Sequence, residues 1–335
     1  MFNYDSESYI EPIDSNIDDA VRISKGWEDY FSHPYISNSD LVYFHKHGYE
    51  NFRYMKASKP EKRYSKAMYL GSMLHKWILE RDTFYDEYVW VEGNIPTSEN
   101  AKRFCSLVAV EADLVIAYNK SYKHNYKNTS TILGHAEKLY EEYKDFIEKY
   151  EEYSTKIPIK KELLDVCKEI EKKLSHLWEF NDKLKKPSGV IVVNEHTIYN
   201  DELELKGKLD KIIIDDRDPK NFKATIIDLK TTFNSHNTHF SEVIKERFYH
   251  MQLALYRFLF IGEWRKQNPK YPNTAEELNV ALKIYAIQTT PPYSIEIYTL
   301  SKDTELEGRY HYIELSHKLN QETTSPNDKF PEHTV

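Results

Sequence analysis

The stretch from Lys206 to Thr232, KGKLDKIIIDDRDPKNFKATIIDLKTT, decides the fold. It predicts two β-strands, 207–214 and 224–230, because both runs are rich in Ile and Leu. The connection between them is polar, contains a proline and suits a hairpin. If the turn centres near that proline, Asp210 and Asp228 lie opposite each other with their β-carbons about 5 Å apart. Like charges in this position destabilise a sheet, so the pattern favours a cation bound between the two carboxylates.

A lysine belongs to the same patch of the predicted sheet. Because side chains alternate along a strand, Asp228 and Lys230 share one face while Leu229 points into the opposite layer. Mg²⁺ needs only one or two protein carboxylates and makes its bound water easier to deprotonate. A nearby lysine can orient that water or offset charge on a phosphate. A D-x-K sequence alone is common on solvated strands, so the rest of the chain must decide between a metal site and a surface ion pair.

Length and composition set the broad class of the protein. With 335 residues, 40% of them hydrophobic, the chain can form one large domain or two ordinary ones. The mean hydropathy is −0.71 and no apolar run approaches the length of a membrane span, so we expect no membrane association. The N-terminus lacks the order of a secretion signal. Cys105 and Cys167 are too few for a disulfide framework, a zinc site or an iron–sulfur cluster, which predicts a cytoplasmic protein.

The charge distribution bears on nucleic-acid binding. A net charge of −8 argues against a protein that coats nucleic acid. One segment, 53–66, nevertheless carries six basic residues against one acidic residue. Arg53, Lys62 and Arg63 in this segment are candidate DNA contacts, although the segment could also be an ordinary solvated loop.

The remaining elements follow from hydrophobic spacing and turn signals. We expect an N-terminal entry segment at 1–35, a single domain at 36–320 with a helical insertion at about 100–187, and a disordered tail at 321–335. Within the domain, apolar residues at helical or alternating spacing predict helices at 66–80, 241–266 and 303–320, and strands at 189–200, 203–214, 280–290 and 293–300. This order predicts an α/β fold with a mixed central sheet flanked by helices.

Two positions outside the D-x-K hairpin carry side chains that could reach it. His75 lies on the predicted helix 66–80, where a histidine is more often a hydrogen-bonded core residue than a metal ligand. Glu195 lies on the strand before the hairpin and could face the same patch as Asp210. In the helical block, two apolar stripes separated near Pro158 predict an antiparallel helical hairpin, whose outer lysines are solvated or line a DNA path.

Several motifs of other enzyme classes are missing from the sequence. It contains no GxxxxGK[ST] loop, so we expect no nucleotide cofactor. It also contains no G-x-S-x-G element and no paired-histidine zinc motif.

Taken in order, the motifs resemble the PD-(D/E)XK nuclease superfamily, with its restriction-endonuclease-like core. GKLD at 207–210 and IIDLKTT at 226–232 resemble its second and third motifs, with Asp in place of the commoner Glu. YHMQLALY at 249–256 and YLGSMLHKWILE at 69–80 resemble the Q-x-x-x-Y and G-x-x-x-H elements of the lambda exonuclease, exonuclease VIII (RecE-like) and RecB-type branch. ISNSDL at 36–41 and TTPPYSIEIYTL at 289–300 also resemble landmarks of the exonuclease VIII family.

The resemblance implies a role for each matching residue. Mg²⁺ or Mn²⁺ would be bound by Asp210, Asp228, the Leu229 carbonyl and His75, with Glu195 as a more distant ligand. Lys230 would activate the water, and Gln252 and Tyr256 would stabilise the site or contact DNA near the cut phosphate. The sequence departs from the family at Phe248, where the family often has Gly, and this puts the local start of the helix in doubt.

The resemblance also implies an activity and partners. We expect a metal-dependent exodeoxyribonuclease that degrades linear double-stranded DNA, 5′-to-3′, in phage or mobile-element recombination. Its family implies a homo-oligomer and a single-strand annealing protein as partner. The alternatives are an endonuclease of the same fold, acting in restriction or defence, and a non-catalytic DNA-binding or scaffold protein that has kept the fold.

Overall fold

The computed structural model describes residues 30–58, 66–110, 113–181, 187–215, 217–218, 221–268 and 278–324. The chain divides into two compact units. The first consists of Met1–Glu28 and Glu61–Leu174, and the second of Asp29–Pro60 and Ser175–Val335. Among the described residues, each unit has a β-sheet of its own.

A five-stranded sheet forms the centre of the second unit. Its strands lie in the order β3 (Val190–Asn200), β4 (Leu205–Asp215), β5 (Lys223–Thr232), β6 (Asn279–Gln288) and β7 (Ile295–Thr299). The strands β5 and β6 run parallel, and all other neighbours run antiparallel. The prediction of an α/β fold with a mixed central sheet is therefore confirmed.

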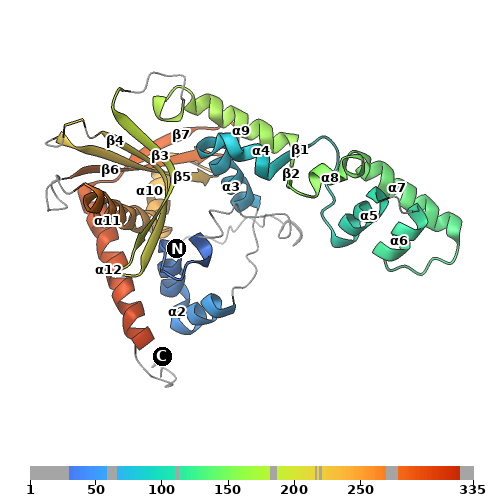
Figure 1. Ribbon diagram of the computed structural model, residues 1–335, viewed down its shortest axis with the longest axis horizontal. Helices are drawn as coiled ribbons and strands as arrows, with labels where there is room; N and C mark the ends of the chain where they lie inside the picture. Colours follow the sequence, from blue (N-terminus) through green and yellow to red (C-terminus); the bar gives the residue numbers. More distant parts are fainter. Residues whose placement is uncertain are drawn as a thin grey trace, which may run out of the picture. The chain divides into compact units, whose positions relative to one another are not determined.

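Helix α11 connects the two parallel strands and packs on the sheet. It spans Tyr249–Gln267 and contacts β3, β4, β5 and β6. Its outer side is covered in turn by α12 (Lys302–Thr324), which also contacts α2 (Asn38–Ser58), as Figure 1 shows. Because it is buried between the sheet and a second helix, α11 is apolar on more than one side.

Gly308 allows α11 and α12 to approach closely. A β-carbon at this position would collide with the backbone carbonyl of His250 and lie 2.9 Å from the amide nitrogen of Met251. Only glycine leaves room for the backbone of the neighbouring helix here.

The hairpin of β4 and β5 has the register that the sequence predicts. Lys211 pairs with Ile227 and Asp215 with Lys223, so the same register places Asp210 opposite Asp228. The ladder ends at the Lys211 pair, however, and beyond it β4 continues beside β3 while β5 continues beside β6. The two central strands therefore separate at the two aspartates, and backbone groups at this fork need partners other than the neighbouring strand.

The structure corrects the prediction of one helix over 241–266. Two helices are present, α10 (Asn237–Glu246) and α11, and they meet at Phe248. Phe248 has φ 58° and ψ 30°, the left-handed conformation that favours glycine. The helix start at this point thus depends on a strained residue, where the resembled family often has Gly.

The first unit combines helices with a short parallel sheet. Its elements are α3 (Lys66–Leu79), η1 (Arg81–Thr83), α4 (Phe84–Glu87), β1 (Tyr88–Val91), α5 (Glu99–Ala109), α6 (Leu114–Ser121), α7 (Thr129–Glu148), α8 (Tyr150–Tyr153), β2 (Ile157–Lys160) and α9 (Lys161–Leu174). Helices α5, α6 and α7 pack on one another around a core that includes Phe104, Ala117 and Ile132 (Figure 1).

The predicted helical hairpin around Pro158 is wrong. Pro158 lies in β2, which pairs with β1, while α9 contacts α3 and α7 contacts α5 and α6. In a two-stranded sheet each strand has a free edge, where a proline costs no ladder hydrogen bond. The short strand was not visible in the sequence because its partner lies far away along the chain.

The expected domain division can be compared with the structure only where the residues are described. Helix α12 continues to Thr324, into the segment 321–335 that we expected to be disordered, and the rest of that segment lies outside the described residues. Most of the entry segment 1–35 also lies outside them. The division of the chain into two compact units does not test the predicted single domain with an insertion at about 100–187, which stays a prediction. Within the described part of the chain, no helix has the length and apolar character needed to cross a membrane.

Candidate metal centre

The site lies where β4 and β5 separate. Asp210 is the last residue before the ladder of β4 with β5 begins, and its Oδ2 accepts a hydrogen bond of 2.7 Å from the backbone N–H of Leu229. This N–H belongs to β5 at the fork, so the carboxylate takes the place of a missing strand partner. The contact holds Asp210 beside the D-x-K strand, as the hairpin register predicts.

Asp228 is almost fully buried, with 1% of its surface exposed. Its Oδ2 lies 2.8 Å from Nζ of Lys230, but neither of its side-chain oxygens has a hydrogen bond of good geometry among the described residues. A buried carboxylate is costly unless it is paired, hydrogen-bonded or bound to a metal ion. The one ion pair with Lys230 leaves lone pairs of the Asp228 carboxylate free, and these lone pairs could bind a cation.

Glu195 lies on β3 in the same row of the sheet. Asn194 pairs with Lys211 and His196 with Leu209, so Glu195 lies between these pairs, opposite Asp210. Its backbone has φ 51°, and its carboxylate forms an ion pair of 2.9 Å with Lys208. A carboxylate oxygen of Glu195 and one of Asp210 lie within 4.8 Å of each other.

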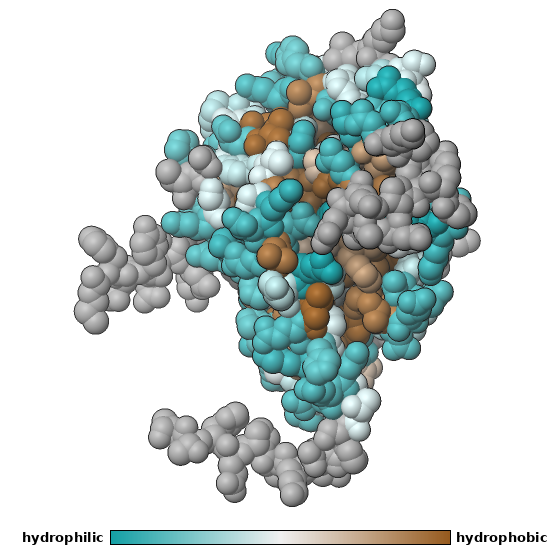
Figure 2. All heavy atoms as spheres, turned by 90° about the vertical axis from the view of Figure 1, so that its left-hand side faces the viewer, coloured by the Kyte–Doolittle hydropathy of each residue, from teal (hydrophilic) through white to brown (hydrophobic). Residues whose placement is uncertain are grey.

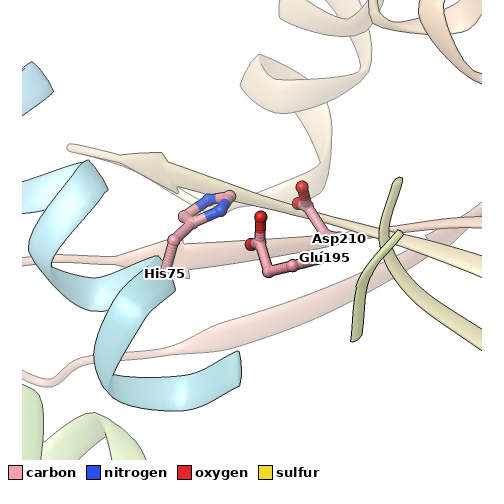
Figure 3. A group of neighbouring side chains, drawn as sticks. All are labelled: His75, Glu195 and Asp210. Carbon is pink, nitrogen blue, oxygen red and sulfur yellow. The ribbon is translucent and has the colours of Figure 1, made fainter. Parts of the chain in front are cut away.

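The three acidic residues therefore come from adjoining strands, β3, β4 and β5. Figure 3 shows the carboxylates of Glu195 and Asp210 turned in the same direction. Carboxylate oxygens are the ligands that Mg²⁺ and Mn²⁺ prefer, and the poorly partnered oxygens of Asp228 supply further capacity. The residues present thus fit a divalent cation.

The electrostatics of the site agree with this conclusion. Burial, together with the neighbouring charge of Asp228, raises the pKa of Asp210 to about 7, against the opposing effects of Lys230 and the Leu229 N–H. The protein alone therefore does not neutralise the negative charge that it gathers here. A bound cation would do so, because an opposite charge nearby favours the ionised carboxylate.

Lys230 is the cation of the D-x-K strand. Burial lowers the pKa of its ammonium, but the carboxylates of Asp228 and Asp210 outweigh burial and the net shift is upward. Its Nζ also lies 4.8 Å from the centre of the Tyr249 ring, an attractive cation–π position. Lys230 is therefore a charged hydrogen-bond donor beside the two aspartates.

Gln252 and Tyr256, the residues of the Q-x-x-x-Y element, lie on α11 and form a pair. The Gln252 side-chain amide donates a hydrogen bond of 2.7 Å to the Tyr256 hydroxyl. Burial raises the pKa of Tyr256 well above its usual value, and the charges of Asp228 and Asp210 add to this shift. The phenol therefore stays protonated near the carboxylates and can act as a donor.

Both residues line a cavity of about 380 Å³ in the second unit. Its lining includes the cations Lys46 and Arg247, and the described lining residues include no acid. Other polar groups come from the start of α2: Ser37, Asn38 and Ser39. This composition suits an anionic ligand better than an apolar one.

The structure leaves the other predicted site residues less well defined. His75, also labelled in Figure 3, is half-buried on α3 of the first unit, and its role as a ligand stays a prediction. Leu229 is buried in β5, and the role of its carbonyl is likewise untested. Arg53 is exposed on α2 and paired with Glu50. Lys62 and Arg63 lie outside the described residues.

Two residues of the site were not predicted from the sequence. Lys208 pairs with Glu195, and Tyr249 lies under the Lys230 ammonium. Lys208 could have been found, because it lies two residues before Asp210 on the same strand. Tyr249 could have been predicted only if the start of α11 at Phe248 had been known. That start places Tyr249 in the first turn of the helix.

The comparison with protein families agrees with this geometry. Residues 37–327 match the model of a family described as "PDDEXK-like domain of unknown function (DUF3799)", a range that includes the described metal centre. No curated protein matches the sequence. A solved structure from Eubacterium rectale, described as a "Putative exonuclease", is similar with a TM-score of 0.43 and 11% identity, over 93% of this chain and 94% of that chain. Because the family match extends over most of its length, the chain belongs to the PDDEXK-like family.

Proposed function

We propose that the protein is a metal-dependent exodeoxyribonuclease that hydrolyses phosphodiester bonds of linear double-stranded DNA, 5′-to-3′, in phage or mobile-element recombination. One observation carries the proposal: Asp210, Asp228 and Lys230 meet at a fork in the central sheet, where the Asp228 oxygens are buried and poorly partnered. A purely structural ion pair does not need a second aspartate beside it. Membership of a PDDEXK-like family supports the same conclusion.

Asp210 and Asp228 would hold the ion, Mg²⁺ or Mn²⁺, with Glu195 beside them and with the Leu229 carbonyl and His75 as proposed further ligands. When bound, such an ion supplies a Lewis acid for the phosphodiester and lowers the pKa of water. The Leu229 N–H fixes the Asp210 carboxylate, and Lys208 fixes that of Glu195. The protein thus orients its own ligands through hydrogen bonds and ion pairs.

Lys230 would donate to the phosphate or orient the attacking water. Its positive charge stabilises the charge that develops on the phosphate oxygens in the transition state. Tyr256, oriented by Gln252, would donate to a DNA phosphate, and Lys46 and Arg247 would attract the DNA strand into the adjoining cavity.

The decisive experiment is digestion of linear duplex DNA in Mg²⁺ by the wild type and by Lys230→Met, which keeps the length of the side chain. We expect cleavage to fall at least about 100-fold, the usual effect of removing a donor to a transition-state charge. DNA binding without metal should be retained. Lys223→Ala, at the exposed start of the same strand, is the matched control and should cleave normally. Normal cleavage by Lys230→Met would falsify the assignment.

A second comparison separates the proposal from an endonuclease of the same fold. An exonuclease digests a linear duplex and spares a covalently closed circle of the same sequence. A label at the 5′ or 3′ end then gives the direction, and we expect release of the 5′ label first. Cutting of the closed circle would establish an endonuclease. Absence of any metal-dependent cutting, with DNA binding intact, would establish a non-catalytic protein.

We also propose that the protein acts as a homo-oligomer in the cytoplasm of a bacterium or of a phage-infected cell, together with a single-strand annealing protein. Cys105 and Cys167 are buried free thiols, which suits a reducing compartment. Co-purification of the tagged protein with an annealing protein encoded in the same mobile element tests the partnership. Recovery of the nuclease alone would argue against it.

A further inference from the structure

An aromatic cluster joins α6, α7 and the loop between them in the first unit. Four rings form a closed group: Tyr118, His124, Tyr126 and His135. Neighbouring centroids in the group lie 4.9 to 6.1 Å apart, and three of the four pairs are stacked, with interplanar angles between 15° and 24°. A fifth ring, Tyr122, stacks on Tyr118 at 5.0 Å.

The cluster reaches the surface. Tyr118 is buried against the core of the helical block, but 45% of Tyr126 is exposed. The loop that carries His124 and Tyr126 is fixed by two hydrogen bonds: the His124 ring is 2.6 Å from the Asn119 amide oxygen, and the Tyr126 N–H donates to the same ring. The outer rings are therefore held in place and do not depend on a partner for their orientation.

The loop that carries the outer rings bears charge of one sign, whereas Glu142 on α7 acts on the Tyr122 ring at the other end of the cluster. Between Asp113 and Glu137 the sequence contains no acidic residue, although the whole chain is acidic. The charged residues of this stretch are all basic and exposed: Lys120, Lys123 and Lys127. Lys138 follows His135 by three positions on α7 and so lies on the same side of that helix.

Stacked rings among lysines match the chemistry of single-stranded DNA. Bases of a single strand expose their faces, which stack on aromatic side chains, while lysines neutralise the phosphates. A duplex hides those faces, and an acidic peptide would use the lysines but not the rings. We propose that the surface formed by Tyr126, His124, Lys123 and Lys127 binds single-stranded DNA. The inference uses no residue of the metal centre and does not depend on cleavage.

The test is the affinity of the full-length protein for a fluorescein-labelled 20-nucleotide oligo-dT, measured by anisotropy in EDTA so that no cleavage occurs. We expect Tyr126→Ala to weaken binding about 5- to 100-fold, as expected for loss of one stacked base. Tyr126→Phe keeps the ring and should bind within about twofold of the wild type. The matched control is Tyr85→Ala in the same unit, which removes a ring of similar exposure, 47%, and should leave binding unchanged.

The lysines are tested through the salt dependence of the same measurement. The double variant Lys123→Ala/Lys127→Ala should reduce the slope of log K against log salt by about 1.4, since each phosphate contact on a single strand contributes about 0.7. The control Lys168→Ala/Lys173→Ala, on α9, should keep the slope. Native circular dichroism with unchanged oligo-dT affinity in Tyr126→Ala and in the lysine variant would overturn the proposal, and so would a wild type that does not bind oligo-dT. Loss of cleavage in Lys230→Met leaves this measurement unaffected, so the two proposals fail separately.

Discussion

At the residue scale, Asp210 makes the metal-free protein sensitive to pH. Its folded pKa is about 7, well above the usual value of an unfolded aspartate near 4. Below about pH 4 the group is protonated in both states, so it makes no difference to stability. Between about pH 4 and 7 the unfolded chain releases the proton first, so the free energy of unfolding falls as the pH rises. Above pH 7 the loss is complete.

Asp210→Asn should remove this loss, because the amide oxygen can still accept the Leu229 hydrogen bond and carries no charge. In EDTA at pH 8 we expect the variant to be more stable than the wild type by about 1–3 kcal/mol, and at pH 4 to be equal to it. Melting curves at both pH values measure the difference. Adding Mg²⁺ should raise the melting temperature of the wild type but not of the variant. A variant that is less stable at pH 8 would contradict this account of the site.

At the element scale, the contact of α11 with α12 depends on Gly308. Gly308→Ala places a β-carbon against the His250 backbone, which cannot move without moving the helix, so we expect a loss of about 1–3 kcal/mol. Gly262→Ala on α11 is the control, because a β-carbon there meets nothing within 4 Å, and it should stabilise the protein by up to about 1 kcal/mol. Urea unfolding measures both. Equal effects of the two changes would show that the close contact is not formed.

Some of the strands, helices and pairings could be predicted from the sequence, and others could not. The β4–β5 register followed from the position of one turn, and that register alone brought Asp210 beside Asp228. Helical spacing predicted the helical character of 249–266 but not the break that separates α11 from α10. The strand β2 could not be predicted, because four residues carry little local signal and its pairing with β1 is a long-range event. The left-handed conformation of Phe248 could not be predicted either. The backbone preference of phenylalanine is against this conformation, and only the surrounding packing maintains it.

At the scale of the whole molecule, α12 carries a stripe of exposed apolar side chains. Leu306, Tyr310 and Ile313 are between 47% and 65% exposed, and their spacing places them on one side of the helix. Figure 2 shows apolar side chains, in brown, at several places among hydrophilic ones on one face of the molecule. Three large apolar side chains in one stripe are more than the scattered exposure of a typical monomer surface.

We therefore expect the protein to have a mass in solution that is a multiple of 39.9 kDa, and Leu306→Glu/Tyr310→Glu to lower it to that of the monomer. Charges placed in an apolar interface prevent its burial. Light scattering after gel filtration measures the mass, and Tyr54→Glu, which changes an isolated tyrosine with 71% exposure on α2, should leave it unchanged. In the monomeric variant the metal centre is intact, so single cleavage events should continue while long tracts of digestion shorten. A wild type of 39.9 kDa would exclude the oligomer and leave the stripe to another partner.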